Sequence, residues 1–497
     1  MSSAADQSPQ SATSDAPAQE VSLLDQIISQ GRLARDDEQR ELAKDLIGEF
    51  VGQVMAGTMT VSKNTLSMLN QRIGQIDALI TKQLNAVLHH EDFQKLEAAW
   101  RGLHYFVHQS ETSTTLKIKV MNASKKDLST DMERAPEFDQ SALFKKVYTE
   151  EFGTFGGSPF GALVGDYEFS RHPQDIALLE KISNVAAAAH APFLTAASPQ
   201  LFNWEEFTEL SGPRDLSKIF ESKDYIKWQS FRNSEDSRYV GLCLPHILMR
   251  LPYGRDTTPV DAFNFEEEVD GRDHKKYLWG NAAYAFATRL TESFAKSQWC
   301  AAIIGVEGGG LVSGLPAHTF LTDDGGVALK CPTEVSIDDR REKELSDLGF
   351  IPLIHCQNTD YAAFFDAQSA QKPQLYNTHA ANANARLSTQ LPYILSTARF
   401  AHYLKAMMRD KVGSFMSRAD CERFLNTWIS GYVTDDDSAS TSVKAQFPLR
   451  EARIDVVDVP GKPGAYKAVA FLKPHYQLKE LTVSLRLVAE LPPSTRG

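Results

Sequence analysis

A glycine-rich stretch at residues 305–314 is the first feature of the chain that could do chemistry. It reads Gly-Val-Glu-Gly-Gly-Gly-Leu-Val-Ser-Gly and comes after an apolar run, which is where a phosphate-binding loop would lie. Such a loop ends in Lys followed by Ser or Thr, because the lysine charge reaches the phosphates, and this pair is absent here. The spacing also differs from that of a dinucleotide-binding loop. We therefore expect a flexible surface loop rather than a nucleotide site.

Two further motifs resemble catalytic or metal-binding sites. Ser158 follows two glycines as in a hydrolase nucleophile turn, but the later glycine of that turn is missing and Pro159 removes the backbone N–H that serves the oxyanion hole. His104 and His108 lie four residues apart on a predicted helix, but the residue after His104 is Tyr rather than the general-base Glu of a metalloprotease. No catalytic residue, metal ligand or cofactor-binding residue is therefore expected, and the sequence favours a structural protein over an enzyme.

The composition limits the classes of protein to which the chain can belong. It has 497 residues, 42% of them hydrophobic, which is enough to bury cores in two or three domains. Its net charge of −12 argues against a chain-wide basic surface for nucleic acid, and its five cysteines are scattered like free thiols of a reducing compartment. No apolar run reaches the roughly 20 residues of a membrane helix, and no signal-peptide pattern opens the chain. We expect a cytoplasmic protein with no cofactor, no nucleic-acid partner and no membrane insertion.

The N-terminal part of the chain is predicted to be a disordered tail followed by a helical arm. Residues 1–20 are rich in Ser, Ala, Gln and Pro and cannot bury a core. Residues 21–110 carry apolar side chains at helical spacing, with long patterned segments at 36–56, 62–88 and 91–110. The arm begins with a short amphipathic helix that either docks on the body of the protein or stays available to a partner. Its apolar positions are Leu23, Leu24, Ile27 and Ile28, and Gly31 marks its expected end.

Residues 111–370 are predicted to form a central α/β domain with a mixed sheet. Strand-like runs alternate there with helical patterns, which is typical of such a domain. Residues 371–392 then resemble a linker, with prolines near both ends. The fold class is therefore α+β or mixed α/β. The strand-like runs lie at 115–120, 192–196, 239–244, 300–306 and 350–355.

Residues 393–497 are predicted to form a C-terminal α+β domain of two helices followed by strands at 453–459, 466–473 and 481–490. The last two strands alternate well, and either close a sheet within the domain or leave an edge that adds a strand from another chain. The helix near 394–411 carries three basic side chains at helical spacing, which either face solvent or meet an acidic partner surface. These side chains are His402, Lys405 and Arg409.

Five strings of residues resemble the large contractile-sheath subunits of type VI secretion, the TssC (VipB) family. The likeness runs from about residue 21 to about residue 491, and such long strings are far more specific than a short motif. The strings are Phe93-Gln-Lys-Leu-Glu-Ala-Ala-Trp-Arg-Gly-Leu103, the stretch from Trp228 to Gly254, the run Tyr277-Leu-Trp-Gly-Asn-Ala-Ala-Tyr284, and residues 306–316 and 449–459.

The resemblance implies a structural and mechanical role. Subunits of this family pair with a smaller partner, TssB (VipA), and polymerise with further copies around a tube of Hcp rings on a baseplate, in the bacterial cytoplasm. Contraction drives the tube outward, and a ClpV-type AAA+ ATPase then takes the spent sheath apart. The sheath of a related phage-tail-like contractile particle is the alternative interpretation.

The resemblance also implies three sites. The ATPase of this family recognises an N-terminal helix, which corresponds to residues 23–33 here. The helix that faces the tube corresponds to residues 394–411, with His402, Lys405 and Arg409. Exchanged C-terminal strands link neighbouring subunits, and the matching positions are Tyr466, Val469, Phe471, Leu481, Val483, Leu485 and Leu487.

Overall fold

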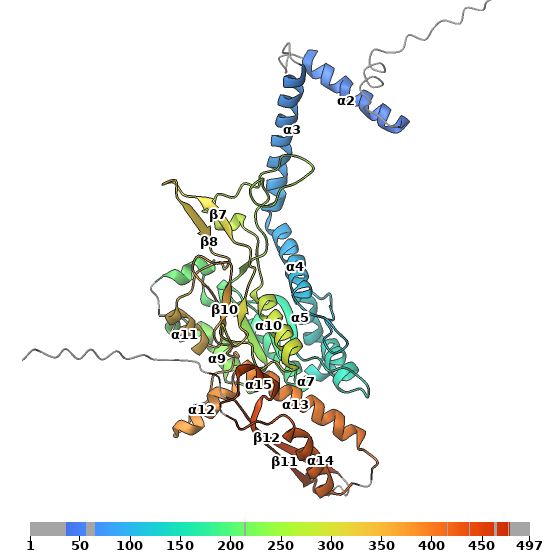
Figure 1. Ribbon diagram of the computed structural model, residues 1–497, viewed down its shortest axis with the longest axis vertical. Helices are drawn as coiled ribbons and strands as arrows, with labels where there is room; N and C mark the ends of the chain where they lie inside the picture. Colours follow the sequence, from blue (N-terminus) through green and yellow to red (C-terminus); the bar gives the residue numbers. More distant parts are fainter. Residues whose placement is uncertain are drawn as a thin grey trace, which may run out of the picture. The chain divides into compact units, whose positions relative to one another are not determined.

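The computed structural model describes residues 36–55, 65–212, 215–414, 416–436, 438–461, 465–475 and 477 (Figure 1). The chain divides into two compact units, residues 1–82 and 83–497, which we describe separately. The first unit contains α2 (Asp37–Met55) and most of α3 (Thr65–Leu88), at the places where the apolar spacing predicts helices. None of the described side chains of residues 36–82 is fully buried, and Leu46 and Met55 are 60% and 83% exposed. The described part of this unit therefore builds no core of its own.

A six-stranded mixed sheet lies at the centre of the second unit, and it confirms the predicted fold class. The strand order is β1-β2-β3-β9-β10-β6, and β1 is therefore an edge strand. The pairs from β1 to β9 are parallel, whereas β10 runs antiparallel to β9 and β6. The strands are β1 (Leu163–Phe169), β2 (Phe193–Ala197), β3 (Val240–Leu244), β9 (Ile351–His355), β10 (Ala362–Phe364) and β6 (Leu311–Val312).

Successive side chains along these strands point to opposite faces of the sheet and into two separate cores. Phe193 and Leu242 point into a core on one face, together with α7 (Pro173–Ala189). Leu194 and Cys243, one residue further along each strand, point into the core of the opposite face, which α10 (Ala282–Ser297) covers. Every residue of β2 and β3 is buried, because helices cover both faces of a parallel sheet.

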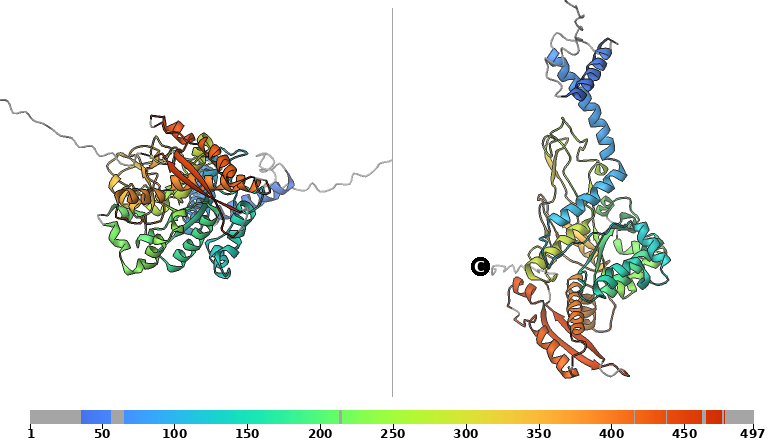
Figure 2. Two further views of the ribbon diagram at one scale, coloured as in Figure 1. Left: turned by 90° about the horizontal axis from the view of Figure 1, so that it is seen from below. Right: turned by 90° about the vertical axis from the view of Figure 1, so that its right-hand side faces the viewer.

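A third core holds the C-terminal region together. The apolar faces of α13 (Leu391–Asp410) and α14 (Arg418–Ser430) pack with β11 (Leu449–Asp458) around Phe400 and Trp299, whose rings stack at 4.2 Å. Both ribbon views show β11 and β12 (Tyr466–Pro474) lying beside α14 (Figures 1 and 2).

The remaining elements connect these layers. The predicted linker at 371–392 contains a helix, and no strand forms at 115–120 or 300–306. The helices are α4 (Glu91–His108), α5 (Lys125–Arg134), α6 (Ala142–Phe144), α8 (Leu216–Phe220), α9 (Ile226–Asn233), α11 (Asp339–Asp347), α12 (His379–Ser388), α15 (Thr441–Gln446) and the π-helix η2 (Lys145–Phe152); single 3₁₀ turns lie at Phe138–Gln140, Pro199–Phe202, Phe207–Ser211, Lys223–Tyr225, Asp236–Tyr239 and His274–Lys276; the remaining strands are β4 (Ile247–Leu248), β5 (Trp279–Gly280), β7 (His318–Leu321) and β8 (Val327–Lys330).

Candidate assembly interface

The C-terminal hairpin has one blocked edge and one open edge. The outer edge of β11 is occupied by side chains of α14. Asn426 donates to Ile454 O at 2.7 Å and accepts from Ile454 N at 3.0 Å, and Arg418 donates to Val456 O at 3.0 Å. The side-chain amide of Asn426 thus takes the place of a neighbouring strand.

The outer edge of β12 is open. Within the described part of the chain, β12 pairs with β11 alone, in a register that runs from Leu449↔Pro474 to Asp458↔Tyr466. An unpaired edge of nine residues presents backbone donors and acceptors that only water or another strand can satisfy. If a strand is added to this hairpin, β12 is the side that can receive it.

The predicted strand-exchange residues on β12 divide between two faces. Tyr466 packs against the core shared with α14, whereas Val469 and Phe471 lie on the opposite face and are 37% and 51% exposed. Val457 of β11 is exposed as well, so the sheet has an outer apolar face. The other predicted positions, Leu481, Val483, Leu485 and Leu487, lie outside the described residues, as do Leu23, Leu24, Ile27, Ile28 and Leu33 of the predicted ATPase helix.

The expected basic stripe on α13 is turned toward the chain itself. His402 is buried at 4% exposure, and its Nε2 lies 2.9 Å from Ala189 O. Burial lowers the pKa of His402 to about 4, so the ring is neutral near pH 7. The prediction of an exposed, positively charged His402 is therefore wrong, because helical spacing identifies a shared face but not what that face packs against.

Lys405 and Arg409 share that face of α13 and contact the end of η2. The Lys405 ammonium lies 3.4 Å from the centre of the Phe152 ring, and Arg409 donates to Phe152 O at 3.0 Å and to Thr154 O at 2.8 Å. Both side chains are half-buried. A partner could reach them only in part unless these contacts break.

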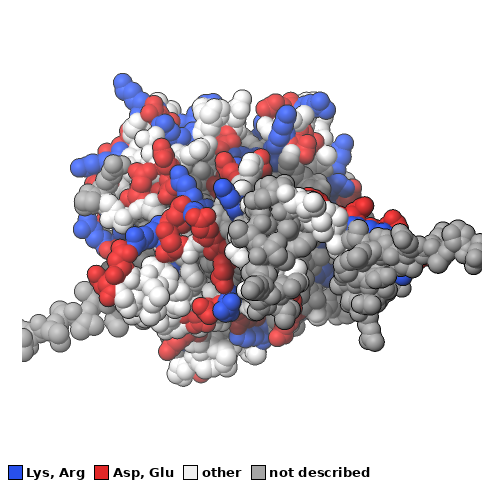
Figure 3. Space-filling view, turned by 90° about the horizontal axis from the view of Figure 1, so that it is seen from above, with Lys and Arg blue, Asp and Glu red and all other residues white. Residues whose placement is uncertain are grey.

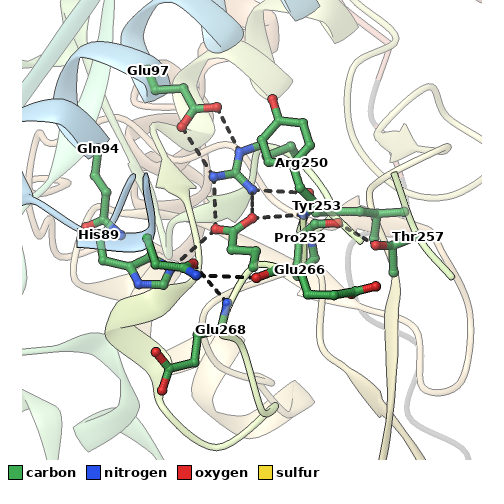
Figure 4. Close-up of polar contacts among 12 residues, drawn as sticks. His89, Gln94, Glu97, Arg250, Pro252, Tyr253, Thr257, Glu266 and Glu268 are labelled. Atoms are coloured by element: carbon green, nitrogen blue, oxygen red, sulfur yellow. Dashed lines mark hydrogen bonds and ion pairs between the residues drawn. The ribbon is translucent and has the colours of Figure 1, made fainter. Parts of the chain in front are cut away.

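A buried ion cluster anchors α4 to the central domain (Figure 4). Arg250 donates to Glu97 of α4 at 2.8 Å and to both carboxylate oxygens of Glu267 at 2.6 and 3.0 Å. The side chains of Arg250 and Glu267 are 8% and 1% exposed. Burial opposes ionisation of Glu97, but the hydrogen bonds from Arg250 and Arg101 lower its pKa, so the cluster is charged.

The C-terminal end of α3 joins the same cluster. Asn85, which is buried, donates to Glu266 O at 3.3 Å and accepts from Glu268 N at 2.9 Å. His89 lies 3.3 Å from Glu267. The residues at the end of α3 are therefore held by directional polar contacts. Sequence reasoning missed this cluster, and its only local signal was an arginine inside an otherwise apolar run at 247–252.

The motifs that suggested chemistry have structural explanations. The loop at 305–314 is a packed turn rather than a flexible one, since a Cβ on Gly310 would lie 2.4 Å from Phe364 O, and Gly305 N donates to that oxygen at 2.7 Å. The rings of His104 and His108 stack at 3.7 Å. Among the described residues no group of His, Cys, Asp and Glu could hold a metal ion, and no helix is long and apolar enough to cross a membrane.

On one face of the molecule, charged side chains of both signs are mixed. On the face drawn in Figure 3, Lys and Arg are interspersed with Asp and Glu and form no continuous basic area.

Comparison with known proteins identifies the chain through two family models. Residues 70–371 match the model described as EvpB/VC_A0108, tail sheath N-terminal domain, and residues 380–491 match the model described as EvpB/VC_A0108, tail sheath gpW/gp25-like domain. The type VI secretion system sheath protein TssC1 of Pseudomonas aeruginosa is 50% identical over 461 residues, which is 92% of this chain and 93% of that protein.

Two solved structures are similar at a much lower level. The baseplate structure of the anti-feeding prophage gives a TM-score of 0.35 at 8% identity, over 63% of this chain and 66% of that one. The contracted helical sheath of the same particle gives a TM-score of 0.31 at 11% identity, over 62% of this chain and 66% of that one. At these values neither structure carries an argument about this chain.

Proposed function

The chain belongs to the TssC (VipB) family of large type VI secretion sheath subunits, and we propose that it pairs with the smaller sheath subunit TssB (VipA) and polymerises around a tube of Hcp rings. It is a contractile sheath subunit, and the family is one of structural proteins. We take its role to be mechanical and not enzymatic, and its place of action to be the bacterial cytoplasm. The observation that carries the assembly proposal is the open edge of β12.

Strand addition suits a sheath because neighbouring subunits must stay connected while their packing changes. A contractile sheath needs two packings of the same subunits. Backbone hydrogen bonds between exchanged strands hold in both packings, since they do not depend on how the domains around them are oriented. The blocked edge of β11 supports this assignment, because it leaves β12 as the single place for a strand on the described hairpin. Residues 481–490 of a neighbouring copy are the strand that we assign to it.

Contact with the tube is assigned to α13 through Lys405 and Arg409, without His402. Once released from Phe152 and Thr154, Lys405 and Arg409 would form exposed ion pairs with the tube, each worth roughly 0–1 kcal/mol, so a few of them guide docking and still let the tube leave. Recycling by a ClpV-type ATPase is assigned to residues 23–33, whose exposure after contraction would mark spent sheaths. A baseplate is the remaining partner in this proposal.

The test is co-expression of the full chain with the small sheath subunit, followed by purification and electron microscopy. We expect long tubules from the intact chain. Deleting residues 481–497 should abolish the tubules and keep the heterodimer, and deleting residues 1–20 is the matched control that should leave the tubules intact. Tubules formed in normal number without residues 481–497 would contradict the strand-exchange assignment, and the absence of any co-purifying partner would contradict the proposed assembly.

A further inference from the structure

Residues 114–123, between α4 and α5, have the sequence pattern of a strand but no strand partner. Leu116 and Ile118 are half-buried, whereas Lys117, Lys119 and Val120 are exposed. The alternation over residues 116–119 agrees with the strand predicted for 115–120, whereas Val120, expected on the same face as Leu116, is exposed. The segment is nevertheless in neither a helix nor a strand.

Both ends of this segment are fixed. At its start Ser113 N donates to Leu116 O at 2.9 Å, and the buried Ser110 hydroxyl lies 2.8 Å from that of Thr291 on α10. At its end Tyr167 of β1 donates to Ala123 O at 2.6 Å. Between these points, no N–H or C=O of residues 117–122 makes a backbone hydrogen bond to any described residue. The segment is thus held in place with its backbone groups left for water or for another strand.

A cavity of about 1020 Å³ lies beside this segment. The segment forms one wall, and the residues of β1, the edge strand of the central sheet, form part of another. Side chains of α4, α10 and α13, among them Trp100, Leu103 and Phe294, line it as well, together with residues 158–162 and 298–300, and much of this lining is apolar. Trp100 and Val120 are 67% and 66% exposed, which is unusual for side chains of this size.

The charges around the cavity are mostly positive. Lys117, Lys119, Lys125 and Arg399 line it, against the single carboxylate of Asp166. Lys119 and Lys125 already pair with Glu151 and Asp175. The excess positive charge therefore belongs to Lys117 and Arg399. Arg399 donates one hydrogen bond to the Tyr403 hydroxyl at 3.2 Å, and its guanidinium lies over the rings of Phe294 and Tyr403. A ligand carboxylate in the cavity would pair with the accessible part of this half-buried guanidinium.

We propose that this cavity receives an extended strand of a second, different polypeptide, with apolar side chains at alternate positions and a carboxylate within reach of Arg399. The inference rests on the proposed pairing with the small sheath subunit and names the surface used. A strand fits better than a helix, because a helix satisfies its own backbone and would leave residues 117–122 unpaired. The chain's own residues 481–490 fit less well, since they carry one Arg and one Glu and so no excess of acid.

Hydrogen–deuterium exchange tests the inference directly. We expect the amides of residues 117–122 to exchange rapidly in the free chain and about tenfold or more slowly in the purified complex with the small sheath subunit. The amides of β2, buried in both states, are the internal control. If the complex forms while these amides keep their rapid exchange, the inference about this cavity is wrong, and the proposed pairing with the small subunit stands. Failure of any complex to form would overturn the proposed function and this inference with it.

Proline substitution supplies a second test. Successive N–H groups of a strand point to opposite edges, so either Ile118→Pro or Lys119→Pro removes a donor on the paired edge. We expect at least one of them to weaken binding of the small subunit about tenfold or more, while the matched Ile118→Val and Lys119→Ala variants bind nearly as wild type. Unchanged exchange of the β2 amides would show that the variants are folded. Wild-type affinity in both folded proline variants would overturn the proposal.

Discussion

Replacing Arg250 with Ala tests the anchor between α4 and the central domain. The substitution removes four charge-assisted hydrogen bonds, two to Glu97 and two to Glu267, and leaves both carboxylates in a buried site without the arginine charge between them. Glu97 keeps its bond from Arg101, and Glu267 keeps those from His89 and the Tyr253 amide. Removing one partner of a buried pair costs about 3–5 kcal/mol, and the remaining donors place the expected loss at the lower end, about 3 kcal/mol.

The loss of stability should be confined to the segments around Arg250, so the assay must report on single segments of the chain. Hydrogen–deuterium exchange in rising urea reports the free energy of opening of α4 and of residues 250–268 separately from the rest of this multidomain chain. Arg340→Ala is the matched control, since its ion pair with Glu344 lies on the surface at 84% exposure, and it should change the opening free energy by less than about 0.5 kcal/mol. Arg250→Ala combined with Glu267→Ala should lose less than the sum of the single changes.

The reasoning would be refuted by a loss below about 1 kcal/mol for Arg250→Ala, which is the size of an exposed ion pair. It would also be refuted if the control variant opened α4 as easily as Arg250→Ala does. Either result would mean that the cluster is only one contact among many at this junction.

Three further predictions concern stability and recycling. Burial opposes the charged forms of His246 and Glu334, but their contact, with Glu168 and His274 beside them, raises the pKa of His246 to about 10 and lowers that of Glu334 to about 2. The ion pairs of His246 and Glu334 should therefore stabilise the fold fully between about pH 4.5 and 6.5, and this stabilisation should fall toward pH 2 and toward pH 10. His246→Gln should flatten the profile of melting temperature against pH, and an unchanged profile would contradict the prediction. Asn426→Ala should lower the free energy of unfolding in urea by about 1–3 kcal/mol and increase aggregation, because it removes two hydrogen bonds to β11 and one to Glu422 O and opens the edge of β11. A neutral effect would remove the explanation for the blocked edge. Deleting residues 1–33 should leave tubules intact but prevent their disassembly by a ClpV-type ATPase, measured by turbidity; unchanged disassembly would refute the helix assignment.

Sequence periodicity predicted the helices and strands whose apolar residues recur at a regular spacing. The segments 62–88 and 91–110 became α3 and α4, and the apolar runs near 239–244 and 350–355 became β3 and β9. The run at 300–306 failed as a strand because Ile303 and Ile304 fill the core beneath α10 from a loop. Apolar character alone does not distinguish a buried strand from a buried loop.

The sites were harder to predict because they depend on contacts between distant residues. Arg250 meets Glu97 across 153 positions, and nothing near either residue in the sequence indicates the pair. Helical spacing correctly put His402, Lys405 and Arg409 on one face, yet only the packed structure shows that η2 and α7 cover it. Alternation predicted β12, and the strand predicted at 481–490 lies outside the described residues. The choice of the β12 edge depends on Asn426 blocking the edge of β11.

A cryo-electron microscopy map of tubules assembled from this chain and the small sheath subunit tests the central claim most directly. The proposal predicts a strand from a neighbouring subunit hydrogen-bonded along the outer edge of β12, beside residues 466–474. A map in which ordered tubules form while that edge faces solvent would contradict it.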